Sequence, residues 1–165
     1  MRVRWRDVGR LDCTIARTLA VIGDRWTLLV LRDAFLGIRR FEAFQADLGI
    51  TRHRLADRLA RLVKHGVLRR ERYQARPPRF EYRLTEKGVD LYPVISALRA
   101  WGDRHLPDPR GPLVEVAHRS CGHVVEPVLT CPECGERVHA RDMRVHRVDG
   151  VQVDGAPTAP ETGSR

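Results

Sequence analysis

Four side chains near the C-terminus have the spacing of a metal site. His118 and Cys121 are separated by two residues, and Cys131 and Cys134 repeat that spacing within Cys-Pro-Glu-Cys-Gly. Two ligands at this spacing can chelate one ion, and the following glycine lets the backbone turn so that N–H groups point at the sulfurs. Together the pairs offer three thiolates and one imidazole, and thiolates favour Zn²⁺ over hard cations. We therefore expect a structural zinc ion bound by these four residues.

Other interpretations of this cluster stay open. His123 could compete with His118, although its spacing from the preceding cysteine is wrong for a metal-binding turn. Cys131 and Cys134 could instead form a redox-active disulfide, or the thiols could simply be free. The apolar residues between the two pairs suit a small hairpin, so residues 118–147 resemble a zinc-ribbon-like module.

The charge of the chain favours a polyanionic partner. Its 165 residues carry a net charge of +9, and 42% of them are hydrophobic, which is enough for one sizeable core and a small appendage. Residues 1–110 contain 24 lysines and arginines against 13 acidic residues, whereas residues 111–165 contain 6 against 8. The basic excess therefore belongs to the first part, and nucleic acid is its expected partner.

Several other classes of protein are not indicated by the sequence. The basic N-terminus is not followed by an apolar stretch, and the most apolar run, at 26–36, is short and interrupted by charges. The cysteines do not have the pattern of a secreted disulfide framework. There is no Gly-rich phosphate loop and no ordered nucleophile and base. We expect a cytoplasmic protein that is not an enzyme; an enzyme that uses the clustered cysteines is the remoter alternative.

An amphipathic helix at residues 51–65 is the element that must position any DNA-reading side chains. Thr51 is a good N-cap, and Gly66 is a good residue to follow the C-terminal end. The face expected to join the core carries Leu55, Leu59, Leu62 and Val63. The opposite face carries His53, Arg54, Asp57, Arg58, Arg61 and Lys64. Taken alone, this pattern also fits a basic helix that simply faces solvent.

Three helices are predicted before this one. The first covers residues 13–22, and Asp24 caps the second, 25–36, which is apolar on nearly all sides and is expected to be buried. The third covers 40–48 and ends at a glycine. Only about three residues then separate it from helix 51–65, which is the spacing of a helix-turn-helix, in which the second helix enters the major groove.

A β-hairpin and a long helix are predicted next. Residues 67–73 and 80–84 read as strands on either side of a Pro-Pro turn, so the helix-turn-helix gains a wing at 74–80. A wing can place an arginine in the minor groove. Residues 86–106 carry a long apolar stripe, with Pro93 either kinking the helix or lying in its first turn. We expect this helix to pair with a second copy; the alternative is packing within its own domain.

The predicted fold class is mainly α with a small β component. It is a winged helix-turn-helix with a long C-terminal dimerisation helix, followed by the zinc-ribbon-like module. The expected parts are a basic N-terminal arm (1–12), the winged and dimerisation domain (13–106), a linker (107–117), the module (118–147) and a disordered tail (148–165).

Five ordered motifs carry a family resemblance. They are Cys-Thr-Ile-Ala-Arg from Cys13, Gly-Asp-Arg-Trp-Thr-Leu-Leu from Gly23, Arg-Phe-Glu-Ala-Phe from Arg40, Leu-Ala-Asp-Arg-Leu from Leu55, and Arg-Pro-Pro-Arg-Phe-Glu-Tyr-Arg-Leu-Thr-Glu-Lys-Gly from Arg76. Together they resemble the HxlR family of bacterial transcription regulators, which are winged-helix proteins related to the MarR group. The resemblance covers roughly residues 10–106.

The resemblance implies a homodimer joined through the first and last helices of the winged domain. Each subunit would present one recognition helix and one wing to a pseudo-palindromic operator. Several family members respond to electrophiles or oxidants, sometimes through a cysteine near the N-terminus, and Cys13 matches that position as a redox-sensing candidate. The alternative for Cys13 is an inert residue at the dimer contact.

The predicted DNA-binding surface combines the recognition helix 51–65 with the wing. Arg54 is the preferred reader of guanine, because arginine can bond O6 and N7 together. Asp57 either accepts from cytosine or orients Arg61 four residues later. The full predicted set is Arg39, Arg40, Thr51, Arg52, His53, Arg54, Arg58, Arg61, Lys64, Arg76 and Arg79.

Two functions other than DNA-dependent regulation of transcription stay open: a metal or redox sensor acting through the Cys cluster, and a protein-interaction adaptor built on a winged helix.

Overall fold

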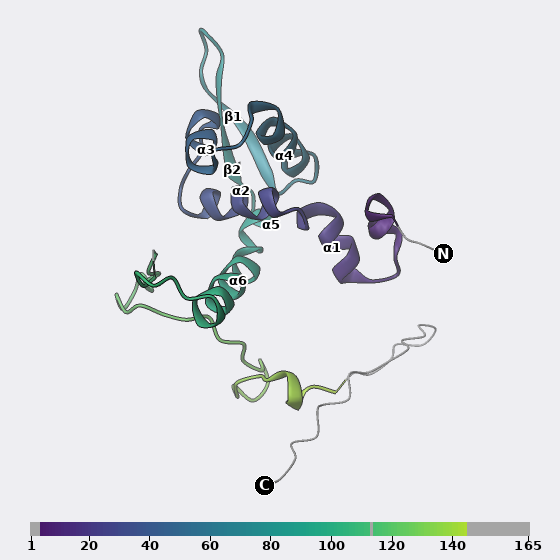
Figure 1. Cartoon of the computed structure of the whole chain (residues 1–165), viewed down its shortest axis with the longest axis vertical. Coiled ribbons are helices and arrows are strands. Elements are labelled where there is room, and N and C mark those ends of the chain that lie inside the picture. Colours follow the sequence, from purple (N-terminus) through teal and green to yellow (C-terminus); the bar gives the residue numbers. More distant parts are fainter. Residues whose placement is uncertain (1–3, 113, 145–165) are drawn as a thin grey trace. The chain divides into compact units, whose positions relative to one another are not determined.

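The computed structural model describes residues 4–112 and 114–144. Two compact units divide the chain, unit 1 (Met1–Val114) and unit 2 (Glu115–Arg165), and the division lies within the predicted linker 107–117. None of the helices formed by the described residues has the length and apolarity needed to cross a membrane. In chain order the elements are η1 (Trp5–Arg10), α1 (Thr14–Ile22), α2 (Arg25–Phe35), α3 (Phe41–Leu48), α4 (Arg52–Lys64), β1 (Leu68–Gln74), β2 (Arg79–Leu84), α5 (Glu86–Val89), α6 (Tyr92–His105) and η2 (Ala140–Asp142) (Figure 1).

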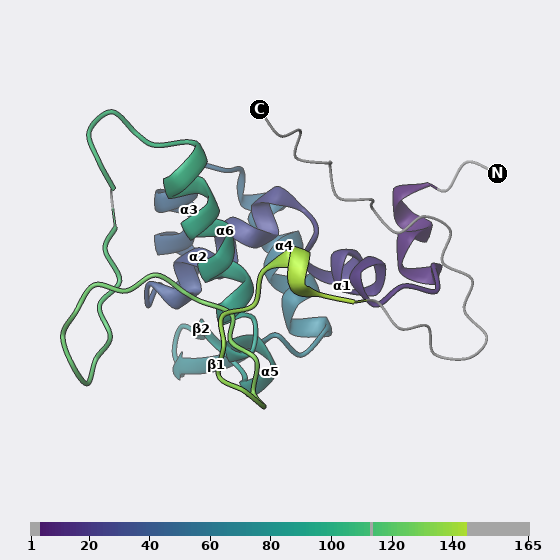
Figure 2. The same ribbon diagram turned by 90° about the horizontal axis from the view of Figure 1, so that it is seen from below.

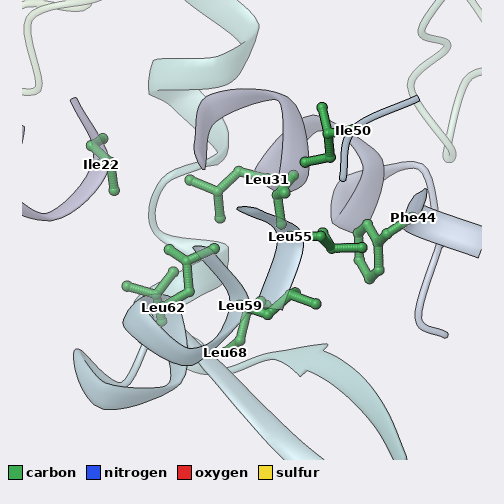
Figure 3. Packing of buried hydrophobic residues seen from close by; sticks show 10 residues of the cluster. Ile22, Leu31, Phe44, Ile50, Leu55, Leu59, Leu62 and Leu68 are labelled. Carbon is green, nitrogen blue, oxygen red and sulfur yellow. The ribbon is translucent and has the colours of Figure 1, made fainter. Parts of the chain in front are cut away.

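The hydrophobic core of unit 1 is formed mainly by α2, α3, α4 and the start of the β-hairpin (Figure 3). The end of α1 and the turn before α4 add one residue each. Helix α4 contributes the residues predicted for its inner face, with Val63 only partly buried. Burial of these aliphatic side chains is the main stabilising contribution of the unit. The buried cluster consists of Ile22, Val30, Leu31, Phe44, Ile50, Leu55, Leu59, Leu62, Val67 and Leu68.

Helix α2 begins where predicted, but not all of its buried side chains are apolar. The Asp24 carboxylate accepts hydrogen bonds from the backbone N–H groups of Trp26 and Thr27, which satisfies two free donors of the first turn. Thr27 and Asp33 are fully buried, although both are polar. Burial raises the pKa of Asp33, although Arg32 donates to its Oδ1 over 2.7 Å. The predicted burial of this helix is therefore confirmed, and two polar side chains lie among its buried residues.

The helix-turn-helix prediction is confirmed by α3 and α4. Gly49 adopts φ +61° and ends α3, a conformation that favours glycine because it has no Cβ. Thr51 then caps α4, its hydroxyl accepting from the Arg54 N–H over 3.4 Å. Gly66, with φ +68°, follows the C-terminal end of α4. The local signals in the sequence therefore fixed both ends of the recognition helix.

The wing is an antiparallel hairpin of β1 and β2. Its register runs from Leu68 opposite Leu84 to Gln74 opposite Arg79, with an irregularity on β1 between Arg72 and Gln74. The segment before α3 joins the same sheet, because the Tyr82 N–H donates to the Arg39 carbonyl over 2.8 Å. Figure 1 shows the hairpin reaching well beyond the helices.

The single long helix predicted over 86–106 is wrong. The chain forms α5, then breaks, and α6 starts at Tyr92 with Pro93 in its first turn. Proline has no N–H, and its ring clashes with the carbonyl four residues earlier, so a helix cannot run through it undisturbed. Helix α6 packs on α2 (Figure 2). Phe35 of α2 and Tyr92 of α6 meet edge to face, with ring centroids 5.4 Å apart. Pro93 therefore lies in the first turn of a second helix, which confirms that alternative for Pro93.

The N-terminal region is more ordered than an extended arm. Residues 5–10 form the 3₁₀-helix η1, which packs on α1. Gly9 lies so close to α1 that a Cβ there would come within 2.8 Å of the Ala20 Cβ. Figure 1 shows η1 and α1 extending away from the α2–α4 group.

Unit 2 contains two tight turns, knuckle 1 (residues 118–123) and knuckle 2 (residues 131–136). Isolated bridges flank them, Ala117 with Val124 and Thr130 with Arg137. The hairpin predicted between the two ligand pairs is therefore wrong, because each pair lies in a turn of its own. The end of the predicted module (145–147) and the predicted tail (148–165) lie outside the described residues.

Candidate nucleic-acid interface

The first turn of α4 presents three basic side chains to solvent. Arg52, His53 and Arg54 are all exposed. The Arg52 guanidinium stacks over the Phe41 ring at 4.7 Å from its centroid, which links the recognition helix to α3. Within the described part of the chain, no hydrogen bond or ion pair engages the side chains of His53 and Arg54. These two side chains are therefore available to an external partner.

Arg58 lies in the middle of α4 and is engaged within the protein. Its Nε donates to Oδ1 of Asp24 over 2.7 Å, and it also pairs with Asp57. Burial alone would raise the pKa of Asp24, but the Arg58 hydrogen bond and those from the Thr27 and Trp26 N–H groups outweigh it and lower that pKa. Arg58 thus ties α4 to the N-cap of α2.

Arg61 makes a second internal contact. Its guanidinium donates to the Ala20 carbonyl on α1. The predicted pairing of Asp57 with Arg61 is wrong, since Asp57 pairs with Arg58 instead. Arg58, in the middle of α4, and Arg61, near its end, are both partly buried and hold the helix against its neighbours.

One face of the wing carries a neutralised charge network. Arg69 pairs with Glu71, and Arg83 pairs with both Glu71 and Glu81 across the two strands. The hydrogen bond from Arg69 lowers the pKa of Glu71, and the bond to Glu81 raises the pKa of Arg83. This face therefore offers little net positive charge.

The other face of the wing carries two arginines outside the predicted DNA-binding set, Arg70 and Arg72. The Arg70 guanidinium lies 3.6 Å from the centroid of the Phe80 ring, and Arg72 is paired with Phe80 in the strand register. Because residues two apart in a strand share a face, the spacing of Arg70 and Arg72 could have predicted a cationic face of the wing. Arg76 and Arg79 are exposed at the tip. The wing is thus cationic on one face and at its tip.

Most of the predicted DNA-binding residues are exposed, and two are not. The two partly buried members are Arg58 and Arg61. Arg40 is fixed by stacking over the Tyr73 ring at 4.8 Å from its centroid. The exposed members are Arg39, Arg40, Thr51, Arg52, His53, Arg54, Lys64, Arg76 and Arg79.

The cysteines lie in three places. Cys13 is exposed at the N-cap of α1 and makes no side-chain capping bond. In knuckle 1, Nδ1 of His118 lies 3.3 Å from Sγ of Cys121. In knuckle 2, hydrogen bonds from the backbone of Cys134 and the neighbouring glutamate, and from the Cys134 side chain, lower the pKa of Cys131. In the described residues, no three His, Cys, Asp or Glu side chains lie close enough together to bind one ion.

Comparison with known proteins agrees with this geometry. The profile of the HxlR-like helix-turn-helix family matches residues 21–110, from the end of α1 past the end of α6. The chain belongs to the HxlR-like helix-turn-helix family. The uncharacterised HTH-type transcriptional regulator Rv3095 of Mycobacterium tuberculosis (strain ATCC 25618 / H37Rv) is 46% identical to this HxlR-like protein over 130 residues, which is 79% of this chain and 82% of Rv3095.

Solved structures resemble the HxlR-like protein to different extents. The crystal structure of PA1607 has a TM-score of 0.76 at 38% identity and covers 85% of this chain and 98% of PA1607. Unit 1 alone is too short for that coverage, so the similarity includes part of unit 2. The redox regulator HypR in its oxidized form has a TM-score of 0.53 at 34% identity, covering 56% of this chain and 97% of HypR.

Proposed function

We propose that this HxlR-like protein is a homodimeric transcriptional regulator that binds a specific double-stranded DNA operator. The observation that carries the proposal is the first turn of α4, where His53 and Arg54 are exposed and free of protein partners among the described residues. The N-terminal residues of a recognition helix are the ones that reach base edges in the major groove.

The proposed contacts divide into base reading and phosphate binding. Arg54 reads a guanine, with Arg52 and His53 beside it. Arg76 and Arg79 at the wing tip enter the minor groove, where the potential is most negative. Backbone phosphates are contacted by Arg39, Arg40, Thr51 and Lys64. Arg58 and Arg61 support the helix from inside, in place of the DNA contacts expected from the sequence.

A second copy of the chain is the proposed partner of two apolar helix faces. On α1, Ile15 is 70% exposed, and Leu19 lies one turn further along the same face. On α6, Val94, Leu98 and Trp101 are exposed at i, i+4 and i+7, while Leu91 and Ile95 pack on the core. Large apolar patches on a soluble protein mark interaction sites. These are the first and last long helices of the winged domain.

An oxidant or electrophile is the proposed effector, with Cys13 as the sensing residue. Cys13 is exposed at the N-cap of α1, the helix assigned to the dimer contact, so its modification would act on subunit packing. HypR, which resembles this chain, is a redox regulator. The rival proposals are a sensor acting through the Cys cluster of unit 2 and an adaptor for other proteins.

Selection of DNA sequences by the purified full-length protein tests the proposal. We expect an enriched two-fold-related motif, bound by two chains, and a specific affinity at least about 10³-fold above that for unrelated DNA at physiological salt. Repeating the titration with a thiol oxidant, on the native chain and on Cys13→Ala, tests the effector. Weak, sequence-independent binding would favour the adaptor. An oxidant response that persists in Cys13→Ala would favour the Cys cluster.

A further inference from the structure

Knuckle 1 is held by three backbone hydrogen bonds. The His118 N–H donates to the His123 carbonyl over 2.9 Å, and the Gly122 N–H donates back to the His118 carbonyl over 2.7 Å. The Val125 N–H closes the base of the turn by donating to the Val116 carbonyl over 3.0 Å. The turn is therefore closed at both its tip and its base.

Knuckle 2 has the same three bonds at equivalent positions. The Cys131 N–H donates to the Glu136 carbonyl, the Gly135 N–H to the Cys131 carbonyl, and the Val138 N–H to the Leu129 carbonyl, each over 2.8 Å. The positive φ values also match, +72° at Gly122 in knuckle 1 and +73° at Gly135 here. The two knuckles are thus the same backbone structure formed twice.

The equivalence of the two knuckles shows which side chains occupy matching positions. His118 occupies the position of Cys131, and Cys121 occupies the position of Cys134, so each knuckle offers two metal-ligating groups at matching places. His123 corresponds to Glu136, and both contribute only a backbone carbonyl to the turn. His118, not His123, is therefore the histidine in a ligand position.

The side chains of knuckle 1 are already arranged as two ligands of one ion. Nδ1 of His118 lies 3.3 Å from Sγ of Cys121. Tetrahedral zinc bonds of about 2.0 Å to nitrogen and about 2.3 Å to sulfur would separate these atoms by about 3.5 Å. The other ring nitrogen, Nε2, lies 3.3 Å from Oγ of Ser120. Metal-ligating histidines are commonly oriented through their second nitrogen in this way.

Unit 2 has little else to stabilise it. None of the described residues between 115 and 144 is buried, and only Val116, Cys131 and Val138 are even partly buried. Val124 and Leu129 are 59% and 72% exposed. A module of this size without a hydrophobic core needs a metal ion or a disulfide to hold its parts together.

We propose that the two knuckles close on one structural Zn²⁺, bound by Nδ1 of His118 and the thiolates of Cys121, Cys131 and Cys134. Four protein ligands complete a tetrahedral site and leave no position for a substrate. Binding releases the protons of the coordinated thiols. The knuckles lie apart in the described structure, and the segment 125–129 between them has no regular secondary structure, so it allows them to come together.

Metal analysis of the full-length protein, purified under reducing conditions and dialysed against metal-free buffer, tests this proposal. We expect one zinc per chain in the native protein and in the matched control His123→Ala. His118→Ala should weaken zinc binding by more than about tenfold, because removing a ligand costs more than removing its supporting residue. His118→Cys supplies a fourth thiolate and should retain one zinc per chain. With Co²⁺ in place of zinc, the native chain should give the strong visible absorption of a tetrahedral thiolate site, and His118→Cys should shift it.

Two outcomes would overturn the inference. One is a native chain with no bound zinc and with Cys131 and Cys134 joined as a disulfide in mass spectra of the unreduced, alkylated protein. The other is loss of zinc in His123→Ala with full retention in His118→Ala, which would contradict the equivalence of the knuckles. Both readouts are made without DNA, so they are independent of the proposed regulatory function.

Discussion

The Nε atom of Arg58 on α4 lies 2.7 Å from Oδ1 of Asp24, the residue that caps α2. The same carboxylate accepts from the backbone N–H groups of Trp26 and Thr27. One carboxylate therefore starts the buried helix of the core and fixes the recognition helix against it. Arg58, in the middle of α4, orients that helix, and the first turn remains exposed for the proposed DNA reading.

Replacing Asp24 by Asn separates these two roles. Asparagine is as good an N-cap as aspartate, so the change keeps the cap and removes the charge pair. We expect the free energy of unfolding to fall by about 1 kcal/mol at neutral pH, since both side chains are only partly buried. Urea unfolding of the two proteins, followed by circular dichroism, measures this difference.

The pH dependence of the same pair of proteins gives the control. The folded-state pKa of Asp24 is lowered, so its stabilising contribution is present above the unfolded-state pKa and is lost as the pH falls through the folded-state pKa. The native chain and Asp24→Asn should therefore approach equal stability in acid. A difference that stays constant from neutral to acidic pH would mean that the ion pair is not its source.

Arg54→Ala should relax base specificity at one position of each half-site. A bidentate arginine–guanine pair contributes about 1–3 kcal/mol of discrimination against the wrong base. Competition titrations with operators altered at each position in turn would locate the loss. Arg54→Lys is the matched variant: it keeps the positive charge but lacks the planar fork, so it should retain much of the overall affinity and still lose the discrimination. Unchanged base preference in both variants would rule out Arg54 as the reader.

Arg79→Ala should weaken binding to all sequences alike. If Arg79 neutralises one phosphate, its removal should reduce the slope of log K against log salt by about one unit. Arg110→Ala is the charge-matched control, because Arg110 is paired with Asp108 beyond the end of α6. Equal changes in slope for both variants would show that net charge, and not the wing contact, is responsible.

Local sequence signals were sufficient for much of the winged fold. Thr51 and Gly66 predicted the ends of α4, and Asp24 predicted the start of α2, because capping depends on neighbours within one turn. The sequence also showed that a helix over 86–106 could not run undisturbed through Pro93. The sequence allowed either a kink or a helix start at Pro93; the choice between them also depends on how α5 and α6 pack, which periodicity alone does not contain.

The candidate site was less predictable from the sequence. Contacts with residues distant in the chain decide which of its basic side chains are paired within the protein. Arg54 and Arg58 look alike on a helical wheel, yet only Arg58 meets a carboxylate 34 positions earlier in the chain. Arg61 likewise bonds to α1. In the wing, the strand register decides that Arg69 is neutralised while Arg70 stacks on an aromatic ring. Charge pattern predicts a basic surface, but tertiary pairing decides which cations remain available.

Leu98→Glu should convert the protein from a dimer to a monomer. Leu98 is 52% exposed at the centre of the apolar face of α6, so a carboxylate there would be forced into the proposed subunit contact without a partner. Sedimentation equilibrium measures the mass, and operator binding should fall far more for a two-half-site operator than for a single half-site. Leu129→Glu, the same change at an exposed leucine in unit 2, is the control and should remain dimeric. If Leu98→Glu also stays dimeric and binds both DNAs as the native chain does, the subunits meet through another surface, and the exposed face of α6 needs a different explanation.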